Sequence, residues 1–101
     1  MIKTTLYIGL NDKDTKKQKI PRDDAMAIIM GILNDHGIMG MTFFDARGVW
    51  TYDDGETSEE ETIMVEVLGF SVSDMVIHTL KTKLNQESIG VSREEVKVVF
   101  V

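Results

Sequence analysis

The spacing of apolar residues changes several times along the chain, and the first change predicts a strand followed by a helix. Residues 3–10 place Leu6, Ile8 and Leu10 two apart, which is typical of a strand with one buried face. The next nine residues are polar and rich in lysine, so we expect an exposed loop. Pro21 fits the first position of a helix. Apolar residues then recur at helical spacing: Ala25, Ile28, Ile29, Ile32 and Leu33.

Two further strands are predicted in the middle of the chain, and they form a hairpin. Residues 40–52 make the first of them, with a bulge expected near Arg47 and Gly48, where the alternation breaks. A turn signal follows, and residues 61–68 make the second strand. The larger buried candidates in the first strand are Met41, Phe43, Ala46 and Trp50; those in the second, which share one side, are Ile63, Val65 and Val67.

The last third of the chain predicts a second helix and a terminal strand. Ser71 or Ser73 can cap the helix, whose apolar residues again recur at helical spacing. A polar link over 86–94 then leads to an apolar strand at 95–101, which we expect to be central or half-covered. The order is β-α-β-β-α-β, so we predict one α+β domain over 1–101. Its expected architecture is the ferredoxin-like fold, an antiparallel four-stranded sheet with two helices on one face.

Composition and charge narrow the classes of function. The chain has 101 residues and a net charge of −6, which disfavours nucleic-acid binding because phosphate backbones are also negative. It contains no cysteine, so thiol catalysis and cysteine-bound zinc are excluded. No apolar run reaches the roughly 20 residues of a membrane span, and the first residues lack a signal-peptide core. We therefore expect a cytoplasmic protein of a bacterium or a mobile element.

Six carboxylates gather in nine residues around the expected hairpin tip: Asp53, Asp54, Glu56, Glu59, Glu60 and Glu61. Their mutual repulsion predicts a solvated segment that is mobile without a ligand and that orders against a cation or a basic partner. We predict a partner-binding surface here rather than a metal site, because the calcium-loop pattern is absent. The opposite sign appears in the lysine-rich loop between Lys13 and Arg22, which could hold an anionic ligand or touch the acidic run of another subunit.

The uncovered face of the sheet favours an oligomer. Two helices cover only one face, so the other is left to solvent or to a partner. If Phe43 faces the helices, then Phe44, Trp50, Met64 and Leu68 crowd the other face. An exposed apolar patch of this kind usually marks an interface.

The segment from His36 to Gly48, with its Gly-Met-Thr entry into a strand, resembles the PII signal-transduction family. Leu6 to Leu10 and Asp45 to Trp50 also resemble a related family of small bacterial proteins of unknown function. The PII resemblance implies a homo-oligomer, with a trimer favoured and a dimer possible. It also implies a ligand cleft, which we place at Gly40, Met41, Thr42, Arg47 and Gly48. The stretch from Glu87 to Glu94 lacks the glycine-rich, basic turn with which PII proteins close their nucleotide site, so we expect no tight binding of ATP or ADP.

These observations favour a non-enzymatic binding or regulatory module that senses a small ligand or contacts a partner protein. We predict no catalytic site, no metal site and no cofactor. Two alternatives stay open. One is a small enzyme of the dimeric α+β barrel type, in which Asp45 or His78 would act near a pocket on the open sheet face. The other is an acidic inhibitor or accessory protein of a mobile element.

Overall fold

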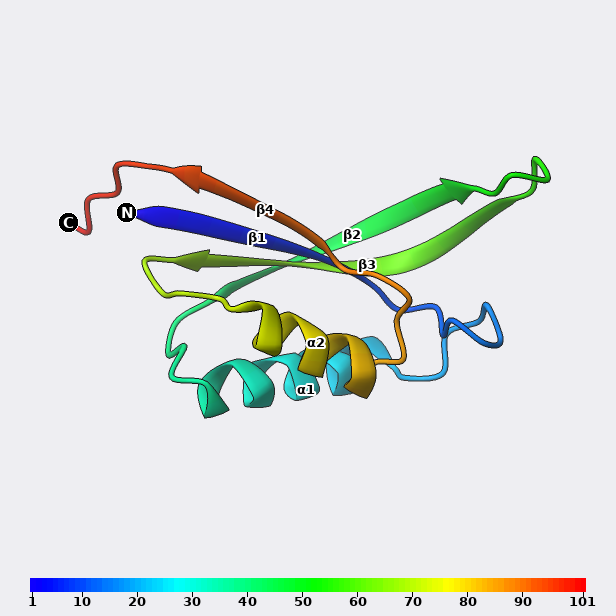
Figure 1. Cartoon of the computed structure of the whole chain (residues 1–101), viewed down its shortest axis with the longest axis horizontal. Coiled ribbons are helices and arrows are strands. Elements are labelled where there is room, and N and C mark those ends of the chain that lie inside the picture. The colour runs from blue at the N-terminus through cyan, green and yellow to red at the C-terminus, as the bar shows by residue number, and fades with distance from the viewer.

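The four strands form one antiparallel sheet, and both helices lie against one of its faces (Figure 1). The computed structural model describes all of residues 1–101. The elements are β1 (Ile2–Gly9), α1 (Arg22–Asp35), β2 (Thr42–Thr51), β3 (Thr57–Leu68), α2 (Asp74–Lys83) and β4 (Gly90–Glu95). The strand order is β2-β3-β1-β4, which confirms the βαββαβ ferredoxin-like architecture.

The core lies between the sheet and the helices, and the strand register explains which residues enter it. Leu6 of β1 pairs with Val65 of β3, and Ile8 pairs with Ile63, so these four side chains share one face. All four are fully buried, as the alternation predicted. On the helix side of the core, α1 contributes Ala25, Ile29 and Leu33, and α2 contributes Val76 and Leu80.

The helices begin where the sequence indicates. Pro21 immediately precedes α1, and Asp23 and Asp24 lie in its first turn, where a carboxylate favours the positive end of the helix dipole. Of the two serines predicted as caps for α2, Ser73 is the cap: its hydroxyl accepts a hydrogen bond from the Val76 amide. Neither helix combines the length and the apolar character that a bilayer crossing requires.

The β2–β3 hairpin is paired almost to its tip, which corrects two predictions. The register runs without interruption from Thr42↔Glu66 to Thr51↔Thr57, so the bulge expected near Arg47 is absent. Gly48 pairs with Glu60 in the regular register, so the strand has no extra residue there and only lacks a side chain. The carboxylates of residues 59–61 lie within β3 and are not part of a loose loop. The turn itself contains only Asp53, Asp54 and Gly55 among its central residues.

The prediction of a terminal strand at 95–101 was wrong. β4 is Gly90–Glu95 and lies at the edge of the sheet beside β1, where Ile2 pairs with Glu95. The last links to the sheet join Val96 to Met1: the Val96 amide donates to the Met1 carbonyl, and the Val96 carbonyl accepts from the Met1 ammonium. Beyond Val96 the apolar segment 97–101 makes no backbone hydrogen bond to the sheet, and Phe100 is 77% exposed.

The face of the sheet opposite the helices is uncovered (Figure 1). Apolar side chains are exposed on part of it. Phe44 pairs with Met64, and both lie on this face together with Tyr7 of β1. Trp50 also points to this side and is 61% exposed, so its expected burial was wrong. The β2–β3 hairpin, called the β2–β3 ribbon below, extends beyond the end of β1. The last residue of β3 that pairs with β1 is Thr62, so the outer half of the ribbon consists of two strands only.

Candidate ligand-binding groove

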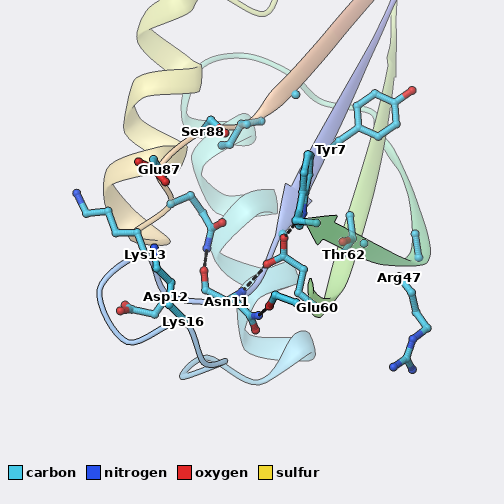
Figure 2. Close-up of a pocket in the computed structure, with 18 of the residues that line it drawn as sticks. Tyr7, Asn11, Asp12, Lys13, Lys16, Arg47, Glu60, Thr62, Glu87 and Ser88 are labelled. Atoms are coloured by element: carbon cyan, nitrogen blue, oxygen red, sulfur yellow. Dashed lines mark hydrogen bonds between the residues drawn. The ribbon is translucent and has the colours of Figure 1, made fainter. Parts of the chain in front are cut away.

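A groove of about 760 Å³ crosses the open sheet face where the β2–β3 ribbon leaves the four-stranded part. Its floor is formed by β1, β2, β3 and the first residue of β4. One end is closed by the loop 11–16 and by the link 86–89 between α2 and β4 (Figure 2). The volume falls within the range of small-molecule clefts, which is roughly 300–1,000 Å³.

Three glycines hollow out this floor. Gly9 pairs with Thr62 on β3, Gly48 pairs with Glu60, and Gly90 pairs with Tyr7 on β1. A Cβ atom added at Gly9 would overlap the Glu60 carboxylate, and one at Gly48 would lie 2.8 Å from Thr62 Oγ1. The missing side chains therefore make room for Glu60 in the floor of the groove.

The Glu60 carboxylate is held in place by two hydrogen bonds from opposite sides. Its Oε2 atom accepts from the Asn11 amide at 3.0 Å, and its Oε1 atom accepts from Trp50 Nε1 at 2.7 Å. Figure 2 shows Glu60 at the centre of the groove residues, next to Asn11. Both donors carry no net charge, and Glu60 forms no ion pair, so its negative charge is not neutralised by a neighbouring cation.

The loop that closes one end of the groove is organised by Asp12, which is 8% exposed. Its Oδ2 atom accepts hydrogen bonds from the amides of Asp14 and Thr15, and its Oδ1 atom accepts from Asn85 Nδ2 at 2.7 Å. The hydrogen bond from Asn85, followed by that from the Thr15 amide, lowers the pKa of Asp12 to about 2. Asn85 has φ of 48°, a left-handed conformation that asparagine tolerates better than most residues.

Asn11 connects this loop to the rest of the groove. Its backbone carbonyl accepts a hydrogen bond from Gln86 Nε2 at 2.8 Å, while its backbone amide donates to Glu60. Its side chain donates to the Glu59 carbonyl and more weakly to Ser58. The link after α2, the loop after β1 and the ribbon strand β3 therefore meet at one residue, and the position of Glu60 depends on all three.

We expect the stability that Asp12 provides to depend on pH. A carboxyl whose pKa is lower in the folded chain stabilises the fold fully above its ordinary pKa of 3.8, and this contribution is lost as the pH falls toward about 2. Asp12→Asn removes the charge at every pH. Urea unfolding at several pH values should show the wild-type protein more stable than the variant at pH 6, with the difference shrinking below pH 4. A difference that stays constant down to pH 2 would contradict this role.

The side chains around the groove suit a flat ligand with a positive charge. Tyr7, Trp50 and Tyr52 offer aromatic surface, and Glu60 offers a carboxylate beside the Trp50 ring. Aromatic faces and carboxylates both attract cations. No cluster of acidic or histidine side chains is arranged to hold a metal ion.

Comparison with known proteins supports the fold but no single family. No family model matches the chain, and no curated protein sequence matches it significantly. Solved structures do match. A phage S-adenosylmethionine lyase in complex with S-methyl-5'-thioadenosine superposes with a TM-score of 0.70 and 24% identity, over 93% of this chain and 80% of the lyase.

Two further structures are of the PII type. GlnK of B. subtilis, bound to ATP, gives a TM-score of 0.56 and 13% identity over 92% of this chain and 80% of GlnK. The PII-like protein CutA of Nostoc sp. gives a TM-score of 0.53 and 15% identity, over 95% of this chain and 81% of CutA. The chain has the PII-like fold. The resemblance seen around residues 36–48 is thus confirmed at the level of architecture, and the same fold occurs in a protein solved with ATP and in a lyase.

The structure divides the residues predicted for the ligand cleft between two ends of the PII-like sheet. Arg47 and Gly48 line the groove. The Arg47 side chain, however, extends away from it and forms an ion pair with Glu59 at 3.0 Å (Figure 2). Gly40, Met41 and Thr42 do not line the groove. Thr42 pairs with Glu66 at the other end of β2, and the nearest side chain to Gly40 is that of Phe70.

The six carboxylates of the acidic run are likewise separated. Asp53, Asp54 and Glu56 are at the hairpin tip, where the Asp54 side chain accepts from the Glu56 amide. Glu59 pairs with Arg47, Glu61 accepts from Gln18 Nε2, and Glu60 lies in the groove. The neighbouring strand therefore supplies an arginine to one carboxylate of the run.

The two residues considered for an enzyme on the open face lie elsewhere. Asp45 is on the helix side of β2 and forms an ion pair with Arg22. His78 is exposed on α2. Sequence reasoning missed Tyr7, Gly9 and Glu60 as groove residues, although strand alternation places Glu60 on the same face as Thr62 and Met64.

Proposed function

We propose that the chain binds S-adenosylmethionine in the groove and cleaves it to S-methyl-5'-thioadenosine. The observation that carries the proposal is the Glu60 carboxylate, fixed beside Trp50 in a groove of ligand size. It is supported by the superposition on a phage lyase whose complex contains S-methyl-5'-thioadenosine. This proposal replaces the non-enzymatic module as the preferred hypothesis.

The parts of the groove match the parts of this ligand. S-adenosylmethionine has a flat adenine ring and a sulfur atom with a permanent positive charge. The ring can stack on aromatic side chains such as Tyr7 and Trp50, and the sulfonium is attracted both by aromatic faces and by Glu60. Lys13 and Lys16, at the closed end, can pair with the ligand's carboxylate.

The reaction needs little chemical help from the protein. The product keeps the methyl and adenosyl carbons on sulfur, so the bond that breaks joins sulfur to the γ-carbon of the amino-acid part. Its electron pair goes to sulfur, which becomes neutral. The γ-carbon forms its new bond to the ligand's own carboxylate oxygen and gives a cyclic ester, homoserine lactone. No water, proton or cofactor enters this balance, so the protein's task is to hold the carboxylate close to the γ-carbon.

We also propose that the protein is a homo-oligomer, with a trimer favoured, because a second copy would cover the open face beside the groove. Phe44 and Trp50 are 45% and 61% exposed there, and the apolar tail at 97–101 makes no backbone hydrogen bond within its own chain. Light scattering at micromolar concentration should give a mass near three times 11.4 kDa. A mass of one chain would contradict the assembly.

Turnover is the direct test of the proposed activity. Purified protein incubated with S-adenosylmethionine should release S-methyl-5'-thioadenosine and homoserine lactone in equal amounts, measured by mass spectrometry. Tyr7→Ala should slow the release, while Glu59→Gln, which changes a charge on the opposite face of the sheet, on β3, should not. The absence of release with the wild-type protein would contradict the lyase activity. Release with an unsaturated amino acid in place of the lactone would replace the cyclisation step by an elimination.

A ligand-binding protein without catalysis is the second candidate, and the ATP complex of GlnK favours it. Lys13 and Lys16 at the end of the groove are the residues that a phosphate chain would need. Against it stands the absence of a glycine-rich cradle in loop 11–19. Low-micromolar affinity for ATP by isothermal titration, together with no turnover of S-adenosylmethionine, would favour this candidate.

A further inference from the structure

We infer that Glu60 makes the groove selective for the charge of its ligand, so that it holds a cationic adenosyl compound and releases the neutral product. The inference rests on the proposed function and adds a residue that decides between substrate, product and nucleotide. It follows from the position of the Glu60 carboxylate in the groove, from the two hydrogen bonds that hold it, and from the absence of an ion pair.

The carboxylate is preorganised, and it has no cation of its own. Each oxygen accepts one hydrogen bond, from Asn11 or from Trp50, and each has a further lone pair. The neighbouring carboxylate Glu59 is neutralised by Arg47, whereas Glu60 is in no ion pair. The space for its side chain exists because residues 9 and 48 are glycines. A fixed, unneutralised negative charge within a groove attracts a cation more strongly than a mobile surface charge does.

The chemistry of the proposed reaction changes this attraction. Before cleavage the sulfur carries a positive charge, and afterwards it is a neutral thioether. The product therefore loses its interaction with Glu60 but keeps its stacking on the aromatic side chains. Because the interaction is present only on the substrate side, product inhibition should be weak.

The same charge acts against nucleotides. The phosphate chain of ATP carries several negative charges, and any pose that places it over Glu60 is repelled. The groove can therefore accept the adenosine part of ATP and still bind ATP poorly. This gives a second reason, besides the missing glycine-rich turn, for the weak nucleotide binding expected from the sequence.

The test compares ligands that differ in charge at one position. Isothermal titration would measure the affinities of sinefungin, whose amine replaces the sulfonium without a cleavable bond, S-adenosylhomocysteine, which has a neutral thioether, and ATP. Wild-type protein should bind sinefungin at least about tenfold more tightly than S-adenosylhomocysteine, as expected for a charge-assisted contact in a partly buried site. ATP should bind more weakly still.

Glu60→Gln and its control then assign the selectivity to one side chain. In Glu60→Gln the ratio of the two affinities should fall toward one, chiefly through loss of sinefungin binding. Glu59→Gln removes the same charge from the next residue, on the opposite face, and should keep the wild-type ratio. A general loss of packing would weaken both ligands equally and leave the ratio unchanged, which would overturn the inference.

The wild-type measurements stand even if Glu60→Gln fails to fold. Equal affinities of wild-type protein for sinefungin and S-adenosylhomocysteine would overturn the charge selectivity but leave adenosyl binding intact. No binding of either ligand would overturn both the selectivity and the proposed function.

Discussion

Leu6→Ala is expected to lower the free energy of unfolding by about 3–5 kcal/mol, the usual cost of removing a fully buried leucine side chain. Leu6 is 0% exposed and lies on β1, between β3 and β4, where it pairs with Val65 and Val91. The cavity would open between the sheet and the helices, in the centre of the core. For a domain of this size the loss is a large part of a total stability of roughly 5–15 kcal/mol.

The next residue provides the matched control. Tyr7 is adjacent on the same strand but points to the open face and is 44% exposed. Tyr7→Ala should cost much less stability than Leu6→Ala and should instead weaken binding in the groove. Urea unfolding followed by circular dichroism measures both variants. Equal losses of stability would mean that the two faces of β1 are equally buried, which contradicts the open-face arrangement.

Gly9→Ala should weaken the binding of a cationic adenosyl ligand by at least about tenfold, with little effect on stability. The new Cβ would overlap the Glu60 carboxylate, which is the flexible end of a side chain and can move. Moving it breaks the hydrogen bonds from Asn11 and Trp50, so the charge leaves its position in the groove. Titration calorimetry with sinefungin gives the affinity, and the fluorescence of Trp50, the only tryptophan, reports the change beside it.

Gly31→Ala is the corresponding control. Gly31 lies within α1, and an added Cβ would meet nothing within 4 Å. This variant should be more stable by about 0.5–1 kcal/mol, because alanine favours the helix more than glycine does. It should bind sinefungin with wild-type affinity. Unchanged binding in Gly9→Ala as well would show that the carboxylate finds its place without the space that glycine provides.

The sequence predicted the fold because alternation and helical spacing depend on local pattern alone. Leu6, Ile63 and Val65 face the core as expected, and Ser73 caps α2. The end of the sheet was not predictable in the same way. The apolar stretch at 95–101 has the composition of a strand, but a strand forms only where a neighbouring strand offers backbone partners, and the local pattern does not show which residues β1 pairs with.

The site was harder to predict for a related reason. Glu59, Glu60 and Glu61 are identical in type and adjacent in sequence, and only cross-strand partners separate their roles. From the density of negative charge alone, the sequence predicted that all three glutamates lie on one solvated surface. The alternation of β3 could have placed Glu60 on the open face, but its position in a groove depends on glycines in two other strands, at residues 9 and 48.

The measurement that tests the central claim most directly is an amide chemical-shift titration of the protein with sinefungin. Binding in the groove should shift the backbone amides of Gly9, Gly48 and Gly90 and the indole N–H of Trp50, which donates to Glu60. The amides of residues 40–42, at the other end of β2, should stay in place. Shifts confined to residues 40–42 or to the hairpin tip at 53–56, or no shifts at millimolar ligand, would contradict an adenosyl-binding groove on the open face of the sheet.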